Sequence, residues 1–197
     1  MRMFFIGIAL SLGVTSVALS GCSDQSHEPH PSLQNPELWS YGIDPHGTRA
    51  EYGDSLIQGG VAQIAFDRVP RPGPESNSWV ELIYYAPEGH LHGVEELQLT
   101  YQSSEPLLVK FSQSDYGEEG DNSFAHYQAR IPATDGWHTA RLLPEDFGRP
   151  DWTPADSLDV GLRLENVNAI YMAPDLSDET GGYAELKVKA VELMAAE

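Results

Sequence analysis

Apolar and polar residues alternate at every second position in several separate segments of this chain. A period of two is the pattern of a β-strand with one buried face and one face toward water. The 18 glycines and 14 prolines are spread along the chain and leave no room for a long helix. The alternating apolar positions are 62, 64 and 66; 97, 99 and 101; 107, 109 and 111; 125, 127, 129 and 131; 162 and 164; and 186 and 188.

Two further segments depart from simple alternation. Trp79–Tyr85 is apolar at nearly every position, as expected for a strand covered on both sides. In the last segment the apolar phase changes between Val188 and Val191, which predicts a β-bulge at Lys189–Ala190. About nine or ten short strands follow one another without a repeat or an internal linker. The sequence therefore predicts an all-β domain over residues 39–197, a two-sheet antiparallel β-sandwich of jelly-roll type.

The N-terminus has the features of a secretory signal. Arg2 is followed by the apolar run Phe4–Leu19, which is short and ends in small residues. The sequence Leu19-Ser20-Gly21-Cys22 resembles the lipobox of bacterial lipoproteins. The resemblance implies removal of residues 1–21 and lipidation of Cys22, which anchors the protein stably on a membrane. If the cell is Gram-negative, Ser23 after the cysteine implies sorting to the outer membrane, so the expected location is the bacterial cell envelope.

Residues 22–38 are rich in Ser, His, Pro, Gln and Asn without an apolar period, and we expect a flexible tether. The net charge of −19 argues against binding to nucleic acid and against flat adhesion to anionic lipid. Cys22 is the only cysteine in the chain. Once it is lipidated, no thiol remains for a disulfide or a thiolate nucleophile.

The order of segments resembles a known family. An early Trp with a Gly-rich stretch is followed by "SWVELIYY", "GVEELQLTYQSSEPLLVKF", "SDYGEEGDN", "HYQARIPATDGWHTARLLPEDF" and "YAELKVKAVEL". This order is similar to the galactose-binding-type jelly rolls grouped with family 11 carbohydrate-binding modules and the complex-I intermediate-associated proteins. The resemblance covers Trp39 to Leu193. It implies a galactose-binding-domain-like fold and a non-catalytic glycan binder or adaptor.

Cationic side chains at polar strand positions point to a ligand. If neighbouring strands align, they collect on one sheet face, where planar donors would bind sugar hydroxyls or carboxylates. Aromatic residues would pack on the apolar face of a pyranose. The predicted carbohydrate-binding residues are Lys110, His126, Gln128, Arg130, Arg141 and Arg163, with Tyr116, Trp152 and Tyr171 as aromatic partners; Tyr85 is a further aromatic candidate.

In an alternative interpretation, the same cations are ordinary surface residues that pair across strands with Glu81, Glu96, Glu165 or Glu185. Trp137, four residues before Arg141, is better suited to packing over the sandwich edge than to stacking on a sugar. No cofactor is required by any motif. The resemblance allows one structural calcium, for which Asp44 and Glu192 are the candidate ligands.

Three functions remain open from the sequence. The first is a non-catalytic, membrane-anchored lipoprotein that binds a polysaccharide or oligosaccharide on a sheet face, with the β-glucan class favoured by the resemblance. The second is an envelope adaptor that docks a protein partner. The third, a polysaccharide-active enzyme, is disfavoured because the chain shows no serine elbow, no HExxH and no carboxylate pair along a strand. We therefore expect a protein that is not an enzyme.

Overall fold

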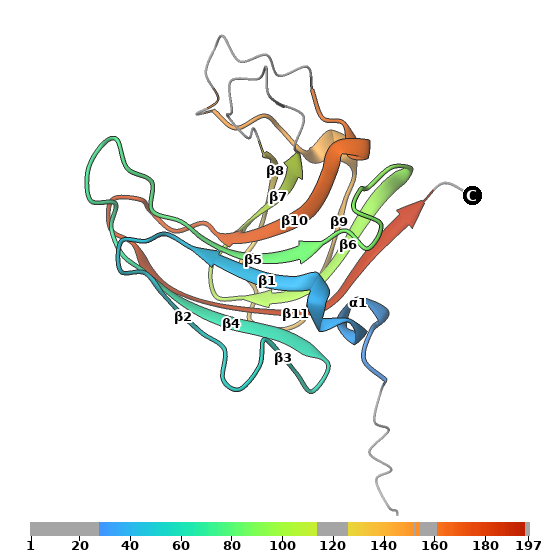
Figure 1. The fold of residues 1–197 in the computed structure, drawn as a ribbon, viewed down its shortest axis with the longest axis horizontal. Coiled ribbons are helices and arrows are strands. Elements are labelled where there is room, and N and C mark those ends of the chain that lie inside the picture. Colours follow the sequence, from blue (N-terminus) through green and yellow to red (C-terminus); the bar gives the residue numbers. More distant parts are fainter. Residues whose placement is uncertain (1–27, 114–125, 152, 154–160, 196–197) are drawn as a thin grey trace, which may run out of the picture.

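Two antiparallel β-sheets pack face to face in the computed structural model, which describes residues 28–113, 126–151, 153 and 161–195 (Figure 1). The strands are β1 (Trp39–Ile43), β2 (Arg49–Glu51), β3 (Ile57–Gln58), β4 (Val61–Arg68), β5 (Val80–Tyr85), β6 (Val94–Ser103), β7 (Leu107–Gln113), β8 (Tyr127–Ile131), β9 (His138–Leu142), β10 (Val167–Pro174) and β11 (Gly182–Ala195). The only helices in the described residues are single turns: α1 (Pro31–Gln34), η1 (Pro36–Leu38), η2 (Pro144–Asp146) and η3 (Leu164–Asn166).

Sheet A has the strand order β1-β5-β10-β7-β8, and sheet B has the order β2-β4-β11-β6-β9, with β3 also paired to β4. In Figure 1, β5 and β10 form the upper layer and β4 and β11 the lower one. Every strand pair is antiparallel, and the chain crosses repeatedly from one sheet to the other. The predicted all-β two-sheet sandwich is confirmed.

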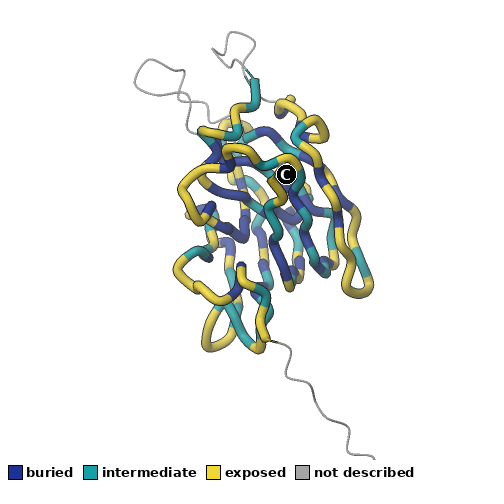
Figure 2. Tube along the Cα trace, turned by 90° about the vertical axis from the view of Figure 1, so that its right-hand side faces the viewer, coloured by how far each residue is buried: buried dark blue, intermediate teal, exposed yellow. Residues whose placement is uncertain are grey.

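The core lies between the sheets because the strands alternate as the sequence indicates. On β4, Ala62, Ile64 and Phe66 are buried, whereas the residues between them are partly exposed. Figure 2 shows buried and exposed segments alternating along the strands. Tyr101 and Leu82 are among the largest fully buried side chains. At about 25 cal/mol per Å² of buried apolar surface, such side chains each contribute roughly 1.5–3 kcal/mol.

The predicted bulge in the last strand is present. The pairing of β11 with β6 shifts between Val188 and Ala190, so that Lys189 is the extra residue. The bulge lets Val188 and Val191 both reach the core, although they lie in opposite phases of the sequence pattern.

The strand predicted at Leu162 and Leu164 is wrong. This segment has no strand partner and leads into the helical turn η3. The fully buried side chain of Gln113 explains the difference, because it donates to the carbonyl of Gly161 (3.0 Å) and accepts the N–H of Arg163 (2.7 Å). These backbone groups are therefore satisfied without a neighbouring strand.

The packed part of the chain begins before Trp39, inside the segment predicted as a tether. Leu33 of α1 is buried in the core, and Ser32 links two distant segments. Its hydroxyl accepts the N–H of Val191 (3.1 Å), and its carbonyl accepts the indole N–H of Trp39 (2.7 Å). The polar composition hid this turn, whose first helical residue is Pro31. Within the described residues, no helix has the length and apolar character needed to cross a bilayer.

Candidate functional site

The outer face of sheet A carries the largest group of predicted site residues. These positions alternate with the core positions of each strand and so point away from sheet B. We use "the outer face of sheet A" for Glu81, Ile83 and Tyr85 of β5; Ala169, Tyr171 and Ala173 of β10; Leu108, Lys110 and Ser112 of β7; and Gln128 and Arg130 of β8, with His126 just before β8. Five predicted residues thus share one face: Lys110, His126, Gln128, Arg130 and Tyr171.

Tyr171 lies at the centre of this face. It pairs with Ile83 on one side and with Lys110 on the other. The Ser112 hydroxyl lies 3.3 Å from the Tyr171 hydroxyl, and the His126 ring centroid lies 5.2 Å from the Tyr171 ring centroid. Burial raises the pKa of Tyr171, so its phenol is neutral and keeps its proton to donate. A half-buried ring with a polar tip is suited to contact the ring of a sugar.

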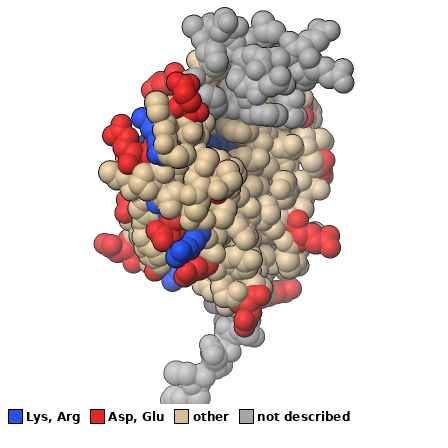
Figure 3. All heavy atoms as spheres, turned by 60° about the vertical axis from the view of Figure 1, so that its left-hand side comes forward, with Lys and Arg blue, Asp and Glu red and all other residues tan. Residues whose placement is uncertain are grey.

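The charges of the face are compensated locally. The Lys110 ammonium lies 2.8 Å from the Glu81 carboxylate, and both side chains are less than one fifth exposed. Arg130 Nε lies 2.7 Å from a carboxylate oxygen of Asp175, at a more exposed position. Lys110 and Arg130, which the sequence predicted to bind a ligand, are therefore each paired with an acidic residue of the same chain. In the view of Figure 3, acidic side chains are scattered around the margin of the molecule, and the blue patches on the left lie beside red ones.

His126 is a neutral imidazole at physiological pH. Burial lowers its pKa, and the nearby Lys110 ammonium lowers it further. The charge of Glu81 and a backbone hydrogen bond with Phe111 oppose this shift without cancelling it. A neutral imidazole can both donate and accept a hydrogen bond, as a sugar hydroxyl can.

Tyr85 and Glu81 complete the β5 side of the face. Tyr85 is exposed, and the Ser40 hydroxyl of β1 lies 3.2 Å from its phenol oxygen. Glu81 was not among the predicted carbohydrate-binding residues, but it was one of the glutamates expected to pair with a cation across strands, and its contact with Lys110 agrees with that expectation. It is the only charged residue between Trp79 and Tyr85.

The predicted strip of four cations on one face is wrong for Arg141 and Arg163. Arg141 belongs to β9 of sheet B, where it forms two hydrogen bonds of 2.8 and 2.9 Å with Glu96 of the neighbouring strand. Arg163 lies in the loop before η3. Alternation at every second position predicts which side of a strand faces solvent, but it does not predict which sheet the strand joins. Tyr116, Trp152 and Cys22 lie outside the described residues.

The two carboxylates proposed for calcium do not share a site. Asp44 accepts a hydrogen bond from Ser78, Ser78 accepts one from Arg68, and Arg68 pairs with Gly182 at the start of β11. Glu192 lies ten residues further along the same strand, about 33 Å away at the usual rise. The oxygens of Asp44 already accept hydrogen bonds from Thr48 and Ser78 and from the N–H groups of His46 and Trp79. Among the described residues, no three His, Cys, Asp or Glu side chains are grouped to hold a metal ion.

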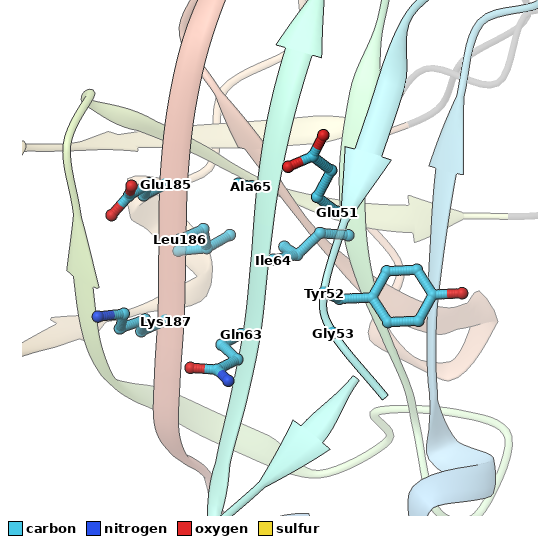
Figure 4. Close-up of a pocket in the computed structure, with 9 residues that line it drawn as sticks. All are labelled: Glu51, Tyr52, Gly53, Gln63, Ile64, Ala65, Glu185, Leu186 and Lys187. Atoms are coloured by element: carbon cyan, nitrogen blue, oxygen red, sulfur yellow. The ribbon is translucent and has the colours of Figure 1, made fainter. Parts of the chain in front are cut away.

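Two open hollows lie on sheet B. The first has a volume of about 260 Å³ and lies beside β4, next to the loop between β2 and β3 (Figure 4). Its lining residues are Glu51, Tyr52, Gly53, Gln63, Ile64, Ala65, Glu185, Leu186 and Lys187. The second, of about 540 Å³, lies at the far end of sheet B beside Arg141, Leu143 and Met194. Neither contains a residue of the outer face of sheet A.

Comparison with known proteins supports the fold. No protein-family model and no curated protein sequence matches this chain. The structure is similar to the family 11 carbohydrate-binding module of the cellulosomal cellulase Lic26A-Cel5E of Clostridium thermocellum, with a TM-score of 0.55, 15% identity, and coverage of 81% of this chain and 88% of that chain. The chain shares the two-sheet antiparallel β-sandwich fold of this module.

A second solved structure is the family 11 module from Clostridium thermocellum in complex with a β-1,3-1,4-mixed-linked tetrasaccharide. It matches with a TM-score of 0.54 and 15% identity over 81% of this chain and 89% of that chain. At such low identity the likeness concerns the arrangement of strands and does not assign a ligand.

Proposed function

We propose that this protein binds a polysaccharide on the outer face of sheet A and does not cleave it. The observation that carries the proposal is the composition of this face around Tyr171. An aromatic ring stands beside a neutral imidazole and a serine hydroxyl, and the amide of Gln128 lies on the next strand beyond Lys110. These groups offer the mixture of apolar surface and neutral hydrogen-bonding partners that sugar rings require. The shared fold with carbohydrate-binding modules supports the same reading.

A neutral glycan fits the face better than an acidic one. Lys110 and Arg130 are held by Glu81 and Asp175, so binding a uronate carboxylate would require breaking these pairs or accepting the nearby negative charge. Hydroxyl groups can instead bind at the free edges of the paired groups without disturbing them. We therefore propose a neutral glycan, and the likeness to a family 11 module in complex with a mixed-linked glucan supports the β-glucan class.

The test compares two tyrosines of similar chemistry on opposite sheets. The mature protein, in a detergent without a sugar headgroup, is titrated with mixed-linkage β-glucan in a calorimeter. Tyr171→Ala should weaken binding at least about tenfold, in line with a cost of roughly 1–3 kcal/mol for lost ligand contacts. Tyr183→Ala, on β11 of sheet B, is the matched control and should bind as the parent does.

The results of this titration decide the proposal. Tyr171→Phe keeps the ring and should retain most of the affinity, which separates ring contact from the loss of the phenol. A parent protein that gives no heat with neutral glucans or with uronates would contradict glycan binding and favour a protein ligand. Release of reducing ends from the glucan would contradict the non-catalytic part of the proposal.

We also propose that Cys22 carries a lipid and that the protein is anchored at the bacterial cell envelope. The sequence Leu19-Ser20-Gly21-Cys22 after an apolar run supports this proposal. Cys22→Ser should release the protein from the membrane fraction or leave residues 1–21 uncleaved. A Cys22→Ser protein that is cleaved at the same bond and sediments with membranes as the parent does would refute the anchor.

A further inference from the structure

Trp79 occupies an unusual position at the β1 edge of sheet A. The six-membered ring of its indole lies over Gly42 of β1. A Cβ atom added to Gly42 would lie 2.6 Å from Trp79 Cζ3 and 3.2 Å from Cη2, far closer than a side chain allows. Because Gly42 lacks a side chain, the indole fills the space where one would stand. The indole nevertheless remains 38% exposed, whereas Trp39 on the core side of β1 is buried.

The Trp79 backbone is fixed from both directions by Asp44. The Asp44 N–H donates to the Trp79 carbonyl (3.0 Å), and the Trp79 N–H donates to the Asp44 carboxylate (3.1 Å). The same carboxylate accepts the hydroxyls of Thr48 (2.6 Å) and Ser78 (3.0 Å). Burial disfavours the charge of Asp44, but these hydrogen bonds together lower its pKa below the usual value. The carboxylate therefore stays ionised and holds Trp79 in place.

The Arg68 side chain further restrains the segment before Trp79 by binding Ser78. Its guanidinium donates to the Ser78 hydroxyl (3.0 Å), to the Ser78 carbonyl and to the Leu176 carbonyl (2.8 Å), and it pairs with Asp178. Loops before β5 and after β10 are thereby tied to the end of β4. An exposed indole on so firmly held a segment loses little conformational freedom when a ligand binds.

Trp79 is continuous with the central part of the outer face of sheet A. Ile83 lies 3.8 Å from the Cβ position above Gly42, and the same Ile83 pairs with Tyr171 of β10. The strands β1 and β10 lie two inter-strand spacings apart, about 9.5 Å. An apolar path thus runs across the strands from the Trp79 indole over Ile83 to the Tyr171 ring.

We infer that Trp79 is a second aromatic platform for the glycan, and that the glycan chain runs across the strands from β10 to the β1 edge. The inference rests on the proposed function, which it extends by one subsite and a direction. The indole would pack on the apolar face of a pyranose ring one or more residues away from the ring at Tyr171. Gly42 and Asp44 are positioning residues, since they set where the indole lies.

The test uses the mature protein and two probes, the β-1,3-1,4-mixed-linked glucan tetrasaccharide and a glucan disaccharide. A ligand long enough to reach both rings should lose about tenfold in affinity when Trp79 is replaced by Ala. A disaccharide bound at Tyr171 alone should lose less than about threefold. Trp137→Ala is the matched control, because Trp137 is similarly exposed but lies beside β9 of sheet B, and it should leave both affinities unchanged.

Two further variants keep the result interpretable. Gly42→Ala leaves the indole present but forces it to move, and it should reduce tetrasaccharide affinity in the same direction as Trp79→Ala. Trp79→Tyr keeps an aromatic ring and should recover part of the affinity. Thermal unfolding of each variant verifies that the sandwich is intact, which the exposed position of Trp79 leads us to expect.

The outcomes separate this inference from the proposed function. If Trp79→Ala binds the tetrasaccharide as tightly as the parent while Tyr171→Ala does not, the Trp79 platform is refuted and the glycan site stands. Equal losses for the tetrasaccharide and the disaccharide would also refute a separate subsite. If the parent binds neither probe, both the proposed function and the platform fail.

Discussion

The ammonium group of Lys110 on β7 lies 2.8 Å from the carboxylate of Glu81 on β5, and β10 runs between these two strands. The side chains must therefore bridge across the middle strand. They can do so because β10 carries the small Ala173 beside the central Tyr171 on this face. The ion pair forms one wall beside the tyrosine ring and leaves the face locally neutral. This neutrality is the physical basis for expecting an uncharged ligand.

Glu81→Gln should change which glycan the face selects. The substitution leaves the Lys110 charge uncompensated, so uronate binding should appear at low salt and weaken as salt rises. Binding of neutral glucan by the parent should depend little on salt. Removing the charge that hydrogen-bonds Lys110 should also lower the free energy of unfolding by about 2 kcal/mol. Calorimetric titration at two salt concentrations and urea unfolding measure both effects.

A control for this experiment is available in η2, which follows β9. Glu145→Gln removes the same charge from the molecule at an exposed position that lines the hollow beside Glu96 and Arg141. If Glu145→Gln alters uronate binding as much as Glu81→Gln does, the effect is one of net charge, and the local role of the Lys110–Glu81 pair is wrong.

Asp44→Ala should be strongly destabilising, by about 3 kcal/mol, because the Thr48 hydroxyl and the N–H groups of His46 and Trp79 would lose their acceptor. The Ser78 hydroxyl would keep the Val69 carbonyl as its acceptor (2.6 Å). The pH dependence has a defined sign. The pKa of Asp44 is lowered in the folded state, so its stabilisation is present above the unfolded value of about 4 and is lost as the pH falls further. Urea unfolding of the parent and the variant measures both, with exposed Asp54→Ala as a comparison expected to change little.

His126 should make the protein less stable at mildly acid pH. Its pKa is lowered by burial in the folded state, so the unfolded chain takes up a proton first as the pH falls. The free energy of unfolding should therefore decline below pH about 6.5 and stop declining, for this group, once the folded imidazole also protonates. His126→Gln should flatten the profile between pH 7.5 and 5, whereas exposed His90→Gln should not. A parent whose stability is constant over this range would contradict a buried neutral His126.

Much of the fold was predictable from local pattern. The alternation on β4, β6 and β7 places the right side chains in the core because the pleat of a strand admits one buried face. The bulge at Lys189 was predictable for the same reason, because the apolar positions shift by one residue there. Short segments were harder to predict. Leu162 and Leu164 alternate as in a strand, but the backbone on either side of Leu162 is hydrogen-bonded to the side chain of Gln113. A contact between residues fifty positions apart leaves no periodic trace.

The candidate site was predictable only in part. The alternation of apolar and polar residues predicts that Lys110, Arg130 and Arg141 face solvent. It does not predict that Arg141 lies on sheet B, because that depends on the pairing of β9 with β6. The ion-pair partners Glu81 and Asp175 each lie across an intervening strand from Lys110 and Arg130, so no spacing in the sequence indicates which acid pairs with which cation. Trp79 begins an apolar run that predicts a covered strand, and the position of its indole depends on the missing side chain of Gly42, nearly forty residues earlier. Long-range pairing therefore decides both the charge of the face and its aromatic edge.

Lys189 offers a test of the bulge in β11. Val188 pairs with Tyr101 and Ala190 with Thr100, which are consecutive residues of β6, so Lys189 is the one residue without a place in this ladder. Deleting Lys189 should keep the register on both sides, and Val188 and Val191 should still face the core. Deleting Lys187 instead should move Leu186 from the core to the outer face of sheet B and prevent folding.

We expect the Lys189 deletion to fold with a lower melting temperature, partly because its ammonium lies 5.7 Å from the Trp137 ring centroid and that contact is lost. Circular dichroism and thermal melts distinguish the two deletions, and a folded Lys187 deletion beside an unfolded Lys189 deletion would show that the bulge itself is required for the sandwich.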